Sequence, residues 1–153
     1  MTLRQTSELT LAIPALARPI IPEIQKTFEK WGRVNNIERD CSPTDSVTLV
    51  LGTVLKSGEK SITGSEYERR LKPNLNLMLG FQHAAWLVEN QGQLPAFNAL
   101  PKVYIDFPGL IITRPDGKRH LLHLTRRGDP WEFSWAPPNL DFHPDGRIAL
   151  SNI

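Results

Sequence analysis

The chain has 153 residues, with 18 Lys and Arg against 16 Asp and Glu, 40% hydrophobic residues and one Cys. A chain of this length buries roughly 68–70% of its unfolded surface, which predicts one folded domain. With 22% charged residues beside this hydrophobic fraction, the composition excludes a disordered chain. Residues 1–100 carry eleven basic and ten acidic side chains, and residues 101–153 carry seven and six. Neither part has the concentrated positive charge that is typical of nucleic-acid binders.

The single cysteine and the hydropathy pattern set expectations for the compartment. Cys41 cannot form an internal disulfide, and an unpaired thiol is typical of reducing compartments. No apolar run reaches the roughly 18 residues of a membrane span. We therefore expect a cytoplasmic protein that does not enter a membrane and needs no cofactor. Because Glu38 and Asp40 lie near Cys41, we expect their charges to raise the pKa of an unreactive thiol.

The N-terminal part predicts a strand followed by an amphipathic helix. Residues 8–13 alternate apolar and polar side chains, as in a half-buried strand that ends at Pro14. Pro22 suits the first turn of the helix and Gly32 suits the position after its last turn. The apolar residues of this helix recur at helical spacing and are Ile21, Ile24, Phe28 and Trp31.

Between these elements and residue 90 the pattern predicts a loop, a strand and two helices. The loop is polar and covers residues 35–46, and the strand is rich in β-branched residues over 47–55. Thr63 and Glu66 have the spacing of a capping box ahead of a short helix. A second helix, over residues 76–90, is apolar over a wide arc, so we expect it to be the most buried.

The last third predicts short strands separated by turns. Pro115-Asp116-Gly117 between two apolar runs is the firmest hairpin in the chain, and Pro108-Gly109 is a further expected turn. The strand-like runs are residues 103–107, 110–113, 118–125, 131–135 and 147–150.

These elements predict an α+β fold in a single domain over residues 1–153. We expect an N-terminal strand and amphipathic helix, a helical pair, and a C-terminal antiparallel sheet of three to five strands. The helices are expected in residues 1–95 and the β-meander in residues 101–153.

Several short motifs, in this order, resemble a group of small uncharacterised bacterial proteins. Those proteins join a helical pair to a C-terminal, Trp-rich antiparallel meander, and the resemblance implies the same architecture over about residues 47–150. No activity is established for that group, so the resemblance implies no catalytic residue. The motifs are Ser57-Gly58-Glu59, Ile62, Gly64, Arg69-Arg70-Leu71, Leu79-Gly80, Trp86 to Gln91, Pro95, Phe107-Pro108-Gly109, Asp116 to Arg119 and Trp131 to Phe142.

Catalytic and metal sites have weak support in the sequence. Asp116 and Lys118, with Asp106 as a second acid, have the spacing of metal-dependent nucleases, but Gly117 favours a hairpin there.

The histidines give no clear metal site. His120 and His123 point to opposite faces of a strand, because their separation is odd. His123, Asp141 and His143 can still meet across the sheet, although surface or structural histidines are the favoured interpretation and we expect no metal. Neither Ser65 nor Ser134 lies in a nucleophile elbow.

The aromatic and basic residues of the C-terminal part give the one positive hypothesis for a binding surface. Aromatic rings beside Arg on an open sheet stack the bases of single-stranded nucleic acids. The same rings pack a sheet against helices, and we favour this core-packing interpretation. The candidate binding residues are Lys118, Arg119, Arg126, Arg127, Trp131 and Trp135.

We therefore expect a non-enzymatic binding protein of a bacterial cytoplasm, a monomer or homodimer, whose partner is a protein or a small ligand. The first alternative is nucleic-acid binding through the Arg and aromatic face of the C-terminal sheet. The second is a small metal-dependent hydrolase that uses Asp106, Asp116 and His123.

Overall fold

The computed structural model describes residues 3–27, 32–126, 128, 130–137 and 140–152. Phe28, Trp31 and Arg127, named above, lie outside these residues. The elements are β1 (Arg4–Ile13), α1 (Ile21–Thr27), β2 (Asn36–Asp40), β3 (Val47–Thr53), α2 (Gly64–Leu71), the 3-10 helix η2 (Lys72–Leu77), α3 (Phe81–Asn90), the 3-10 helix η3 (Gln91–Gln93), α4 (Pro95–Asn98), β4 (Tyr104–Thr113), β5 (Arg119–Thr125), β6 (Glu132–Ala136) and β7 (Gly146–Ser151).

The strands of the described residues form a seven-stranded sheet in the order β1-β3-β7-β4-β5-β6, with β2 also paired to β4. Neighbouring strands are antiparallel except β4 and β7, which run parallel. The α+β class is confirmed, but the expected C-terminal sheet of three to five strands was too small. β1 and β3 correspond to the two strands expected at residues 8–13 and 47–55. They belong to the same sheet as the C-terminal strands because β3 pairs with β7.

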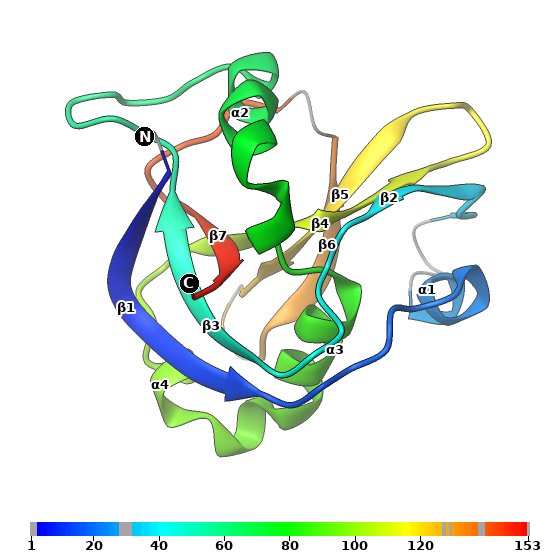
Figure 1. The fold of residues 1–153 in the computed structure, drawn as a ribbon, viewed down its shortest axis with the longest axis horizontal. Coiled ribbons are helices and arrows are strands. Elements are labelled where there is room, and N and C mark those ends of the chain that lie inside the picture. Colours follow the sequence, from blue (N-terminus) through cyan, green and yellow to red (C-terminus); the bar gives the residue numbers. More distant parts are fainter. Residues whose placement is uncertain (1–2, 28–31, 127, 129, 138–139, 153) are drawn as a thin grey trace.

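The helices cover opposite faces of the sheet, so the expected helical pair does not form. In Figure 1, α2 lies above the sheet and α3 and α4 lie below it. On one face, α3 contributes Phe81, Ala84 and Leu87 to a large apolar core. On the other, α2 contributes Tyr67 and Leu71 to a second core. Because strand residues alternate between faces, the sheet supplies apolar side chains to both cores.

Backbone pairing at Leu79 explains two differences from the sequence-based expectations. Pro108-Gly109 does not turn the chain but forms an irregularity inside β4, where the Gly109 amide donates to the Leu79 carbonyl at 2.9 Å. The Leu79 amide donates in turn to Ala149 of β7 at 3.2 Å. Because the backbone of Leu79 is engaged with the sheet, the helix expected from residue 76 begins only at Phe81.

Other local expectations have mixed outcomes. The hairpin is confirmed: Gly117 has a φ of 79° between β4 and β5, and its amide donates to the Arg114 carbonyl at 2.8 Å. The expected N-cap is also confirmed, since the Thr63 hydroxyl accepts from the Glu66 amide at 3.3 Å, but the Glu66 carboxylate accepts from Arg69 and Arg70 instead of completing a capping box. The polar loop at 35–46 was wrong in part, because residues 36–40 form β2 against β4.

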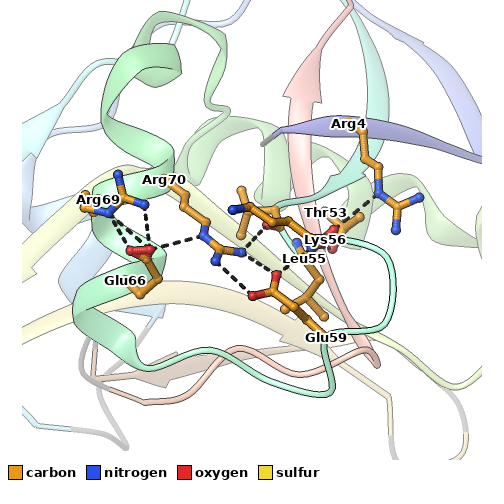
Figure 2. Close-up of polar contacts among 9 residues, drawn as sticks. Arg4, Thr53, Leu55, Lys56, Glu59, Glu66, Arg69 and Arg70 are labelled. Carbon is orange, nitrogen blue, oxygen red and sulfur yellow. Dashed lines mark hydrogen bonds and ion pairs between the residues drawn. The ribbon is translucent and has the colours of Figure 1, made fainter. Parts of the chain in front are cut away.

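A buried arginine fixes α2 on the sheet (Figure 2). Arg70 is only 6% exposed, and its guanidinium donates to both carboxylate oxygens of Glu59, at 2.6 and 3.0 Å. It also donates to the Val54 carbonyl at 2.8 Å and to Glu66 at 3.3 Å. These contacts join α2 to the turn after β3, and Tyr67 lies one helical turn before Arg70.

Candidate functional site

A pocket of about 460 Å³ lies between α2, the sheet, Pro137 and residues 140–143. Its polar groups come from elements far apart in the sequence: Tyr67 from α2, Asp106 and Tyr104 from β4, and His123 from β5. Leu121 and His123 line it together, as expected from their shared face of β5. Its outer wall includes Phe142 and His143.

Asp106 is only 4% exposed and, after Tyr67, is the most buried polar residue of the pocket lining. The Tyr67 hydroxyl donates to Asp106 Oδ2 at 2.7 Å. His123 lies directly opposite Asp106 in the β4–β5 register, and its Nδ1 is 3.4 Å from Asp106 Oδ1. Among the described residues, Oδ1 has no hydrogen bond of good geometry. Burial, followed by the Asp106 charge, raises the pKa of Tyr67 well above its usual value, so Tyr67 stays a donor.

Aromatic rings surround this carboxylate. The rings of Tyr67 and Phe142 have centroids 4.5 Å apart, and Tyr104 meets Phe142 edge-on at 6.3 Å. The Tyr104 ring is also 5.8 Å from the His123 ring. The Tyr104 hydroxyl accepts a hydrogen bond from the His143 amide at 3.2 Å. Burial raises the pKa of Tyr104 to about 12, so its hydroxyl remains protonated at neutral pH.

The charge of the pocket is one-sided. Asp106 and Asp141 line it, whereas no Lys or Arg is among the described lining residues. The nearby Arg147 is held by Glu8 of β1, with Nε 2.7 Å from a carboxylate oxygen. Aromatic walls and carboxylates, with no Lys or Arg among the described residues that line the pocket, suit a positively charged ligand.

The structure brings together most of the residues named for the hydrolase and metal hypotheses. Asp106, His123, Asp141 and His143 share the pocket, whereas Asp116 lies at the hairpin turn, where it accepts from the Lys118 amide at 2.9 Å. Within the described residues, no group of three or more His, Cys, Asp or Glu could hold a metal ion.

Sequence reasoning missed the aromatic members of the pocket, Tyr67, Tyr104 and Phe142. Its polar members Asp106, His123, Asp141 and His143 were named from the sequence, through their residue types.

The described residues of the proposed stacking surface lie outside this pocket, and Trp131 belongs to the core. Trp131 is 1% exposed and stacks on Phe97 with centroids 4.6 Å apart. The Arg126 guanidinium lies 4.9 Å from the Trp131 ring and donates to the Asn98 and Leu100 carbonyls. Trp135 is half-buried against the α3-side core. The core-packing interpretation is therefore confirmed for Trp131.

Lys118 and Arg119 lie at a different place, in a groove between α2 and the β4–β5 hairpin. Arg119 is paired there with Glu38 at 2.9 Å and with Glu68 at 3.0 Å. Within the described part of the chain, Lys118 and Arg119 are therefore separated from Arg126 and Trp131 and do not share one aromatic and basic face with them.

Cys41 is half-buried, and its Sγ lies 3.2 Å from the Leu75 carbonyl. Burial raises the pKa of this thiol most, Arg39 lowers it and Asp40 raises it. The expected direction is confirmed, but desolvation and not the neighbouring acids is its main cause.

Comparison of the chain with family models, with curated proteins and with solved structures gave no match. The resemblance to small bacterial proteins therefore stays an expectation. Over the part of the chain that the structure describes, no helix is both long and apolar enough to cross a lipid bilayer.

Proposed function

We propose that the protein binds a small organic cation in the pocket around Asp106. The observation that carries the proposal is the buried Asp106 carboxylate, which faces aromatic walls with no Lys or Arg among the described lining residues. Removing a carboxylate from water costs several kcal/mol unless a partner compensates. Tyr67 donates one neutral hydrogen bond to Asp106, and no described Lys or Arg lines the pocket, so a cationic ligand supplies the compensating charge.

The aromatic rings favour the same class of ligand. Ammonium groups are attracted to the faces of Tyr and Phe rings by about 0.5–2 kcal/mol, with the larger values at desolvated sites. Tyr104 and Phe142 line the pocket beside the carboxylate, so both contributions act on one bound group. The volume of about 460 Å³ lies in the range of small-molecule sites.

A matched pair of ligands tests the proposal. Choline and 3,3-dimethylbutan-1-ol have nearly the same shape, but only choline is charged. Isothermal titration is expected to give at least tenfold tighter binding of choline, and Asp106→Asn is expected to remove most of this preference. Asp116→Asn, at the hairpin turn, serves as the control and leaves the preference unchanged. Equal affinity for the two ligands, or binding of neither, contradicts the proposal.

A second candidate function is the binding of a nucleic-acid backbone along the groove that holds Lys118 and Arg119. Two adjoining hollows form this groove, and their described lining includes five basic residues and the single acid Glu68. The basic residues are Arg39, Arg69, Lys72, Lys118 and Arg119. Phosphate contacts give affinity that falls steeply with salt. A labelled single-stranded oligonucleotide that shows no anisotropy change at low salt excludes this candidate.

A further inference from the structure

The pocket also contains a histidine beside its buried carboxylate. His123 Nδ1 lies 3.4 Å from Asp106 Oδ1, which is longer than a well-formed hydrogen bond, but catalytic hydrogen bonds are often long without ligand and tighten when substrate binds. A hydrogen bond from Nδ1 to Oδ1 in the liganded state leaves Nε2 as an acceptor. Asp106 is itself held by the Tyr67 hydroxyl at 2.7 Å. A base within hydrogen-bond reach of a bound water, and oriented by a third group, is the arrangement that general-base catalysis requires.

A hydrogen-bond donor lies next to this base. The Tyr104 ring is 5.8 Å from the His123 ring, and both line the pocket. The Tyr104 hydroxyl oxygen accepts from the His143 amide, and it donates to no described residue, so its proton can serve a ligand. A fixed donor beside a base can stabilise the negative charge that develops on a carbonyl oxygen under attack.

We propose that this pocket hydrolyses a carboxylic ester that carries a positive charge. His123 is the general base, Tyr104 holds the oxyanion and Asp106 is the positioning residue for His123. The inference rests on the cation site proposed above, since the bound charge places the ester against His123.

The reaction consumes one water molecule and needs no other reactant. The water oxygen forms a bond to the carbonyl carbon while its proton passes to His123 Nε2, and the carbonyl electron pair moves to the oxygen beside the Tyr104 hydroxyl. When this intermediate collapses, the bond from carbon to the alkoxy oxygen breaks. The proton on Nε2 then passes to the leaving alkoxide, which gives an alcohol and a carboxylic acid and restores the neutral histidine.

Acetylcholine and its neutral analogue 3,3-dimethylbutyl acetate test the inference in a pH-stat, with uncatalysed hydrolysis subtracted. We expect kcat/KM to be at least tenfold higher for acetylcholine. His123→Asn is expected to lower kcat by roughly 10²-fold or more, the usual contribution of a general base. Tyr104→Phe is expected to lower kcat with little change in KM, because its hydrogen bond forms only in the transition state. His120→Asn, outside the pocket, is the control and retains activity.

Asp106→Asn separates positioning from cation binding. For the neutral ester, the Asp106 charge does not serve binding, so a fall in kcat on this ester reports the orientation of His123. An unchanged kcat there overturns the positioning role.

Binding and turnover distinguish the inference from the proposed function. If choline binds but wild type hydrolyses acetylcholine no faster than His123→Asn, the inference is overturned and the cation site stands. If choline does not bind and both esters react equally, the cation site is wrong and so is the proposed substrate class.

Discussion

Arg70→Met removes the side chain that fixes α2 on the sheet and keeps most of its apolar volume. The substitution deletes two hydrogen bonds to Glu59 and one to the Val54 carbonyl. Breaking a fully buried ion pair costs about 3–5 kcal/mol. The side chains of Glu59 and Glu66 are 28% and 27% exposed, so water can solvate their carboxylates after the substitution. We therefore expect a smaller loss, of about 2–3 kcal/mol. For a chain of this size, the loss corresponds to a fall in Tm of roughly 4–12 °C.

Urea unfolding followed by circular dichroism measures this loss, and Arg69→Met is the matched control. Arg69 directly precedes Arg70 in α2, and its side chain is 68% exposed and pairs with Glu66. We expect Arg69→Met to change the free energy of unfolding by less than about 1 kcal/mol. Equal effects of the two substitutions, or a loss below 1 kcal/mol for Arg70→Met, refute the anchoring role.

The same substitution changes the response to acid. The hydrogen bond from Arg70 lowers the pKa of Glu59 to about 2, below its usual value of 4.5. The stability that this contact provides is therefore complete above about pH 5 and is lost as the pH falls toward 2. Arg70→Met is expected to lose less stability over this interval than wild type.

Three further substitutions test the account of the fold by the same unfolding assay. A Cβ on Gly109 would lie 2.5 Å from the Leu79 carbonyl oxygen, so Gly109→Ala is expected to lower the free energy of unfolding by at least about 2 kcal/mol. Gly92→Ala is the control, because a Cβ there meets no atom within 4 Å, and its effect is expected to stay within about 0.5 kcal/mol. Burial lowers the pKa of His83 to about 4, below its usual value of 6.5, so wild type is expected to lose stability as the pH falls from 6.5 to 4. His83→Gln is expected to make the free energy of unfolding less dependent on pH over this interval. Trp131→Ala is expected to cost about 3–5 kcal/mol; a value near zero supports an exposed stacking ring instead.

The sequence predicted those elements that depend only on their own residues and not on distant partners. The alternation of residues 8–13, the spacing of Thr63 and Glu66, and the Pro115-Asp116-Gly117 turn each predicted a feature that the structure contains. β2 has no such pattern, and it forms because the second half of β4 offers an edge to residues 36–40.

The candidate site depends on a register that the sequence does not display. Counted back from the hairpin, regular pairing would set Asp106 opposite Arg126. The irregularity at residues 108–110 adds three residues to β4, and this shift places Asp106 opposite His123. Because the irregularity depends on backbone pairing with Leu79, no local pattern could predict it. Tyr67 reaches Asp106 only because Arg70 holds α2 over this part of the sheet.

The position of bound choline tests the central claim most directly. Nuclear Overhauser effects between the choline methyl protons and assigned ring protons report which side chains contact the cation. The account predicts effects to Tyr104, Phe142 and His123, and their loss in Asp106→Asn. Effects confined to residues outside this pocket, or none at saturating choline, would contradict it.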